Sequence, residues 1–234
     1  MADESIRVPI DGDTSGFDQK VEGMKGTISA ASVAMGNLLS DMGKKALSAF
    51  GDMISSGDEF NKAINQMSSS TGATGAELEG LRDVVKDVYG NNFGDSYEDA
   101  ANAVAEVSKQ TGLMGEELQK ATEGAFALGD TFGYEVNEST RAASALMNNF
   151  GVSAEEAYNL IAVGAQNGAD QNGDLLDTLN EYSTQYAALG LSAEQFTQSL
   201  ISGAESGAFS IDKVGDAVKE FNIRCKDGSD STAE

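Results

Sequence analysis

The stretch Ser153-Ala-Glu-Glu156 returns 39 residues later as Ser192-Ala-Glu-Gln195, and this repetition decides the fold. In both copies a hydroxyl residue is followed three positions on by a Glu or Gln, the pattern of a capping box that opens a helix. Met114 holds the equivalent position of another copy without a capping oxygen, so a few tenths to about 2 kcal/mol of capping is missing there. The complete pattern occurs at Thr74 with Glu77, Ser153 with Glu156, Ser192 with Gln195, and Ser231 with Glu234.

Four glycines recur at the same period, about fourteen residues after each box. A helix stops readily where a glycine turns left-handed, so we expect the first helix of each unit to end there. A second helix should follow and end at Gly112, Gly151 or Gly190, which makes the unit an αα-hairpin. The four breaks predicted after the first helices are Gly90, Gly129, Gly168 and Gly207. One apolar track of the second helices reads Val104, Ala143, Tyr182 and Phe221.

Self-similarity at this period predicts an all-α fold of tandem αα-hairpin repeats of about 39 residues, in a solenoid-like array or a compact bundle. Proline, the strongest helix breaker, occurs once, at Pro9. We expect a long Gly/Ala-rich amphipathic helix before the repeats, and a short N-terminal strand before that helix. The predicted segments are 1–16 (strand or coil), 17–71 (long helical segment), four repeats in 72–228 (72–111, 112–150, 151–189 and 190–228), and 229–234 (start of a truncated fifth repeat). Because the fifth repeat is cut off, we expect this chain to be the front piece of a longer protein.

The predicted helix in residues 17–71 carries apolar and small residues in alternating steps of three and four. That is the heptad spacing of a helix that packs on another helix. The stripe can dock on the repeats, or it can dock on copies of itself. The residues considered for self-association are Ile28, Met35, Leu38 and Met42.

A chain with 15 Lys and Arg against 38 Asp and Glu has a formal net charge of −23. Because phosphate contacts require cations, this charge argues against direct binding of nucleic acid or of an anionic membrane. The acidic surface keeps a helical array soluble, or it offers a face to a basic partner. The longest uncharged stretch near the N-terminus, residues 26–40, is shorter than the roughly 20 apolar residues of a membrane span.

The residue types of most hydrolytic sites are missing. There is no histidine, which excludes a Ser-His dyad and a histidine metal site. The single cysteine, Cys225, cannot hold zinc by itself or form an internal disulfide, which fits folding in a reducing cytoplasm. The segment from Asp170 to Asp174 faintly resembles a calcium loop but lacks the terminal Glu, so a turn explains it better. We therefore predict no catalytic residues, no cofactor and no metal site.

Several short motifs resemble the shared module of tail tape measure proteins of long-tailed bacteriophages and prophages. The resemblance covers roughly residues 57 to 234, and none of its motifs is catalytic. The motifs occur in the family's order, as Gly57 to Arg82, Phe150-Gly-Val-Ser-Ala-Glu-Glu-Ala157, Leu189-Gly-Leu-Ser-Ala-Glu194 and Glu220-Phe-Asn-Ile-Arg-Cys-Lys-Asp-Gly-Ser229.

This resemblance implies a structural protein of the virion tail, assembled in the bacterial host cytoplasm, whose length sets tail length. Its implied partners are tail proteins: the tube, the tail assembly chaperones and the tail tip. A 39-residue unit spans about 58 Å as one helix at 1.5 Å per residue, whereas stacked helices advance only about 10 Å per layer. Folded repeats make a poor ruler, so we expect this segment to be an end or assembly module.

Two other functions fit the sequence less well. A helical solenoid adaptor would bind peptides on a concave face, but aromatic residues make up only 7% of the chain. A wall-degrading tail enzyme would release fragments from purified cell wall, which we do not expect.

Overall fold

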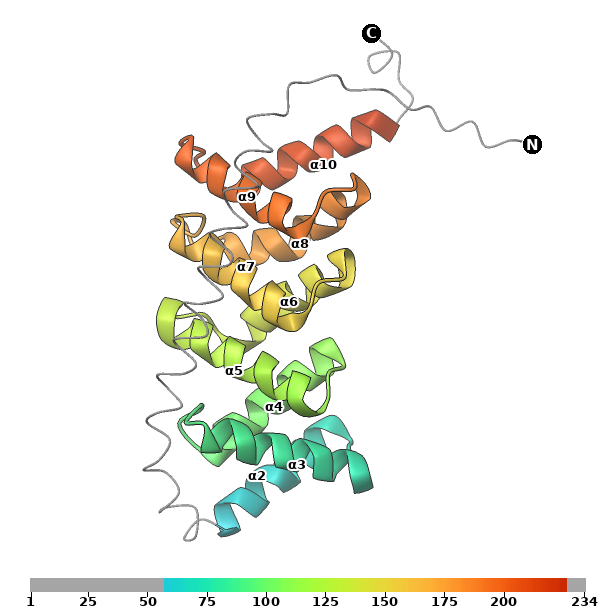
Figure 1. The fold of residues 1–234 in the computed structure, drawn as a ribbon, viewed down its shortest axis with the longest axis vertical. Coiled ribbons are helices and arrows are strands. Elements are labelled where there is room, and N and C mark those ends of the chain that lie inside the picture. The colour runs from blue at the N-terminus through green and yellow to red at the C-terminus, as the bar shows by residue number, and fades with distance from the viewer. Residues whose placement is uncertain (1–56, 227–234) are drawn as a thin grey trace, which may run out of the picture.

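A computed structural model describes residues 57–226, and every regular element in that range is an α-helix (Figure 1). The predicted all-α class is therefore confirmed for this part of the chain. The predicted N-terminal strand and the self-association residues Ile28, Met35, Leu38 and Met42 lie outside the described residues. The helices are α2 (Gly57–Thr71), α3 (Gly75–Gly90), α4 (Tyr97–Thr111), α5 (Gly115–Phe132), α6 (Val136–Phe150), α7 (Ala154–Gln166), α8 (Leu175–Ala188), α9 (Ala193–Glu205) and α10 (Asp212–Lys226).

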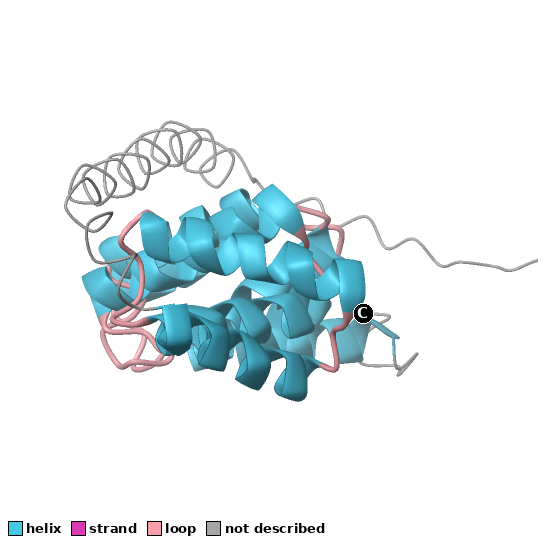
Figure 2. Cartoon of the chain, turned by 90° about the horizontal axis from the view of Figure 1, so that it is seen from below, coloured by secondary structure: helices cyan, strands magenta, loops and turns pink. Residues whose placement is uncertain are grey.

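The helices form an elongated stack of two rows (Figures 1 and 2). Helices α2, α4, α6, α8 and α10 pack on one another in one row, while α3, α5, α7 and α9 form the other. From α3 to α10, consecutive helices also pack across the rows, and each helix of the stack packs on the helix two places along. The apolar core therefore runs along the stack between the rows, and each level depends on the next.

Left-handed glycines follow α4, α6 and α8 of the first row. Gly112 has a φ of 71° after α4, and Gly151 has a φ of 71° after α6, as the sequence predicted. The Gly112 N–H donates to the Ser108 carbonyl at 2.8 Å, so it satisfies one of the last helical acceptors. Gly190 has a φ of 77° and lies two residues beyond the end of α8. A residue with a Cβ would be strained at each of these positions.

The predicted breaks after the other helices are only partly where the sequence placed them. Gly168 and Gly207 are left-handed, both with a φ of 81°, and follow α7 and α9. Gly129 instead lies inside α5, and the left-handed residue is Gly133, with a φ of 77°. A Cβ on Gly129 would lie 3.0 Å from the Tyr134 carbonyl oxygen, so this glycine permits close packing of the returning chain.

The prediction for Gly90 also requires correction, because Gly90 is the last residue of α3 and does not adopt a positive φ. The chain turns later, at Asn92 with a φ of 66° and at Gly94 with a φ of 82°. Asn tolerates the left-handed region better than most residues. The 39-residue spacing therefore located the loop but not the residue that turns it.

The core is built from small and medium side chains with a few aromatic anchors. Leu118, Ala157 and Phe196 occupy equivalent positions of the second row and are completely buried. The Phe196 ring stacks on Tyr186 with centroids 4.0 Å apart. Burying a ring of this size contributes about 1.5–3 kcal/mol, so aromatic contacts between consecutive helices stabilise a core otherwise rich in alanine.

An interior glycine lets α8 and α10 approach closely. A Cβ built on Gly215 would overlap the Tyr182 ring, with its Cγ only 2.6 Å away. Gly215 is therefore needed for its lack of a side chain rather than for its backbone conformation. Tyr182 is 3% exposed because α10 covers it.

Candidate interaction sites

Two of the helix caps named from the sequence form complete capping boxes. Ser153 Oγ accepts a hydrogen bond from the Glu156 N–H at 3.2 Å, and Glu156 Oε2 accepts one from the Ser153 N–H at 2.9 Å. Ser192 and Gln195 make the same pair of bonds at 3.2 and 2.9 Å. These residues fix the starts of α7 and α9 and have a structural role.

The starts of α3 and α5 differ from this arrangement. Thr74 and Met114 hold the N-cap positions, but neither side chain caps the helix, and Glu77 is an exposed first-turn residue. Met114 has no oxygen with which to cap α5, whereas Thr74 has a hydroxyl but is followed by Gly75, which has a φ of 59°. A left-handed residue there redirects the chain away from the geometry of a capping box. The Thr74 hydroxyl pattern therefore marks a helix start without forming the box.

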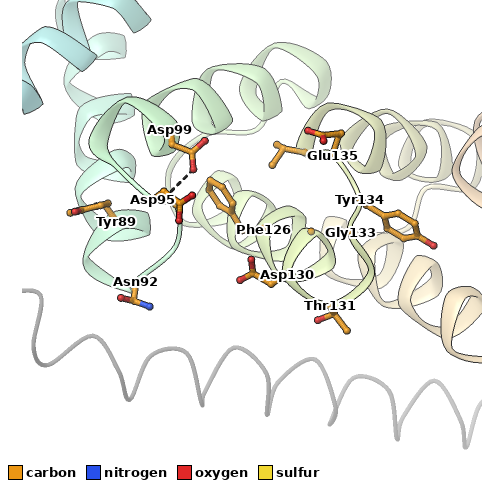
Figure 3. Close-up of a pocket in the computed structure, with 13 residues that line it drawn as sticks. Tyr89, Asn92, Asp95, Asp99, Phe126, Asp130, Thr131, Gly133, Tyr134 and Glu135 are labelled. Atoms are coloured by element: carbon orange, nitrogen blue, oxygen red, sulfur yellow. Dashed lines mark hydrogen bonds between the residues drawn. The ribbon is translucent and has the colours of Figure 1, made fainter.

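A cleft of about 980 Å³ lies between the α3–α4 loop and the end of α5 (Figure 3). Phe126 and Tyr89 contribute aromatic surface to its wall, and several carboxylates surround it. The Asp95 N–H donates to Asp99 Oδ2 at 3.0 Å, which fixes one side of the entrance. The acidic residues of the lining are Asp95, Asp99, Asp130 and Glu135.

The later loops on this side of the stack are joined by hydrogen bonds. Tyr134 Oη donates to Asp170 Oδ2 at 2.7 Å, and Ser210 Oγ donates to Asp174 Oδ2 at 2.5 Å. Burial, together with the hydrogen bond to Asp170, raises the pKa of Tyr134, so the phenol stays protonated and keeps donating. Within residues 57–226 no such bond joins the α3–α4 loop to the α5–α6 loop, and the cleft opens between these two loops.

The lining of the cleft defines what it could bind. Carboxylate oxygens beside aromatic surface suit a cation or an amide N–H group. In the described part of the chain, no cluster of three or more His, Cys, Asp or Glu is arranged to hold a metal ion. None of the helices described here is both long and apolar enough to span a membrane.

A buried carboxylate that the sequence analysis did not single out joins the end of α3 to α5. Glu123 is 8% exposed and accepts hydrogen bonds from Asn91 Nδ2 at 2.8 Å and from Gln119 Nε2 at 2.9 Å. Burial raises the pKa of Glu123 despite these donors. The only sequence signal was an acidic residue amid the buried face of α5, between Leu118 and Ala125.

Two rows of short helices, with capping boxes at the starts of α7 and α9 and glycine turns after several helices, define an all-α protein of stacked helices. Comparison with known sequences then places it more narrowly. Residues 89–234 match the profile of the phage-related minor tail protein family, and the chain belongs to this family. The family is one of structural tail proteins rather than of enzymes.

The chain is also similar to a probable tape measure protein of Streptomyces phage phiC31. The two are 36% identical over 77 residues, which is 33% of this chain and 10% of that relative. No solved structure matches the chain. The predicted resemblance is therefore confirmed: this is a phage tail tape measure-like protein, and it aligns with about a tenth of the length of its curated relative.

Proposed function

We propose that this chain is part of a phage tail tape measure protein that organises assembly of the tail tube and sets tail length. Within that protein, residues 57–226 act as an end or assembly module and not as the measuring rod. The observation that carries this proposal is the packing of each helix on the helix two places along. A 39-residue unit folded into two such helices advances about 10 Å per layer, whereas the same unit as one helix would span about 58 Å.

The helices belong, in this proposal, to four tandem hairpins with bounds 72–111, 112–150, 151–189 and 190–228. Each pair from α3 and α4 to α9 and α10 falls inside one of these ranges. The equivalent boxes at Ser153 and Ser192 open α7 and α9, and the equivalent glycines Gly112 and Gly151 close α4 and α6. We propose a solenoid rather than a compact bundle, and the support for this choice is that contacts extend mainly to the next helices of the stack.

The proposed partners are other tail proteins: the tube, the tail assembly chaperones and the tail tip. With a net charge of −23, the chain favours partners with basic surfaces, and the acidic cleft beside Asp95 and Asp130 is one place for such a contact. Assembly takes place in the host cytoplasm and the protein remains in the virion tail. The chain acts there as a scaffold, without direct contact to nucleic acid and without catalysis.

Deleting the codons for residues 57–226 from the phage or prophage tests this function. Electron microscopy of lysates should then show capsids without normal tails, and supplying the intact gene from a plasmid should restore them. Mass spectrometry of purified wild-type tails should detect peptides of this chain. Normal tails in the deletion strain, or purified tails that lack the protein, would refute the proposal.

A further inference from the structure

Helix α10 exposes positions that are buried in α4, α6 and α8, the three helices before it in its row. Ala100, Ser139 and Thr178 lie 39 residues apart in α4, α6 and α8, and each is at most 2% exposed. The next residue of this series, Ala217 in α10, is exposed. One turn further along, Val104, Ala143 and Tyr182 are at most 3% exposed, whereas Phe221 is 46% exposed.

The contacts of Tyr182 show what normally covers this position. Tyr182 Oη donates to Asp212 Oδ1 at 2.9 Å, and Lys219 Nζ lies 5.7 Å from the centroid of its ring. Gly215 faces the same ring and has no side chain to obstruct it. All three contacts come from α10, the next helix of the row, so the residue at this position is buried by the helix that follows.

Glu181, the acidic residue next to Tyr182, is also contacted by α10. Glu181 Oε1 of α8 pairs with Lys219 Nζ of α10 at 3.6 Å. The equivalents of Glu181 and Tyr182 in α10 are Glu220 and Phe221, which are both exposed. Helix α10 therefore exposes an acidic residue followed by an aromatic one. This is the same pair that α8 uses to contact α10.

The two ends of the stack differ in chemistry. Along α2 the outward residues are polar or charged, among them Asp58, Asn61 and Lys62. The outer surface of α10 instead carries Phe221, which is 46% exposed. An aromatic side chain exposed at a position that α4, α6 and α8 bury indicates an interaction surface.

We propose that the outer face of α10, formed by Ala217, Glu220 and Phe221, is a docking surface for a further helical hairpin of the same class. In the docking helix, a glycine or alanine contacts Phe221, and a cation four residues later contacts Glu220. Gly215 and Lys219 of α10 make the equivalent contacts with Tyr182 and Glu181 of α8. The inference rests on the proposed repeat arrangement and continues the α8–α10 interface by one layer. The sequence pattern Ser231-Thr-Ala-Glu234, one period after Ser192, is the signal for such a hairpin.

Tryptophan reporters test this proposal, because the chain contains no tryptophan of its own. The full chain carries Phe221→Trp, and a second version carries the same reporter with residues 229–234 replaced by a copy of residues 190–228. The copy places the equivalents of Gly215 and Lys219 in register with the reporter. The extended protein should show blue-shifted emission and weaker acrylamide quenching, matching a Tyr182→Trp reporter in the original chain.

Matched controls separate docking from other effects. A Phe209→Trp reporter, on a loop residue that is 92% exposed, should emit at long wavelength in both versions. An extension with Leu in place of the glycine equivalent to Gly215 should leave the Phe221→Trp reporter exposed.

Each remaining outcome is decisive. If Tyr182→Trp is buried while Phe221→Trp stays exposed in the extended protein, the docking surface is refuted and the repeat arrangement stands. If Tyr182→Trp is itself exposed, the repeat arrangement fails as well. If Phe221→Trp is already buried in the original chain and light scattering gives twice the monomer mass, a second copy covers α10 and the proposed occupant is wrong.

Discussion

Replacing Gly215 with alanine perturbs the interface between α8 and α10 at a single point. Gly215 is a buried residue of α10, and a Cβ at this position would overlap the Tyr182 ring, with Cγ at 2.6 Å and Cε2 at 2.8 Å. The Tyr182 ring cannot simply rotate away, because its Oη donates a hydrogen bond to Asp212 and Lys219 lies beside the ring. We therefore expect Gly215→Ala to push the two helices apart.

The expected magnitude follows from two opposing effects. Inserting a methyl group into a packed contact costs about 1–3 kcal/mol, while alanine in a helix interior is favoured over glycine by about 0.5–1 kcal/mol. The net result is a destabilisation of about 0–2.5 kcal/mol, or a fall in Tm of up to about 10 °C for a domain of this size.

Thermal unfolding followed by circular dichroism measures this change, and Gly80→Ala is the matched control. A Cβ on Gly80 would meet only Met114 Cε at 3.9 Å, so this variant keeps the helix-propensity gain without overlap and should unfold at a slightly higher temperature. In a Tyr182→Ala background, Gly215→Ala should become neutral or stabilising. A Gly215→Ala protein as stable as Gly80→Ala would refute the close contact between α8 and α10.

Substitutions at three other places test particular contacts. Ser153→Ala should lower the free energy of unfolding by about 1 kcal/mol. Thr74→Ala removes no capping hydrogen bond and should change the free energy of unfolding little. Equal losses for the two variants in chemical denaturation would contradict this difference between the caps. Glu123 has a raised pKa in the folded state, so its carboxyl favours folding below its unfolded pKa and this contribution is lost as pH rises through the folded value. Glu123→Gln should therefore gain stability relative to wild type between acidic and neutral pH, and parallel Tm profiles for the two proteins would count against this burial. Arg141→Ala removes an exposed ion pair with Asp177 at 2.7 Å and should cost less than about 1 kcal/mol; a larger loss in urea titration would show an additional role for Arg141.

The periodic part of the fold could be predicted from the sequence because the signals are local. The boxes at Ser153 and Ser192 lie within one helical turn and depend little on the rest of the structure. The left-handed conformations of Gly112 and Gly151 follow in the same way from a glycine placed after an apolar helix. Local patterns of this kind specify element type well.

Other features depend on contacts between distant residues and were not predictable from spacing. Gly129 lies inside α5 and close to the Tyr134 carbonyl, and the turn after Gly90 is made by Asn92 and Gly94. The acidic cleft depends on which loops are joined by hydrogen bonds, and the pattern of boxes gives no information on this. Glu123 is marked by its hydrogen bond from Asn91, which lies 32 residues away in the sequence.

Tail length in a phage that lacks one predicted repeat tests the central claim most directly. Deleting residues 151–189 in frame joins Phe150 to Gly190 and thereby restores the Phe-Gly pair that normally precedes the box at Ser153. If residues 57–226 form a folded end or assembly module, electron microscopy should show tails of wild-type length. Tails shortened by about 58 Å, the length of 39 residues in one continuous helix, would contradict this account, because the segment would then serve as part of the ruler.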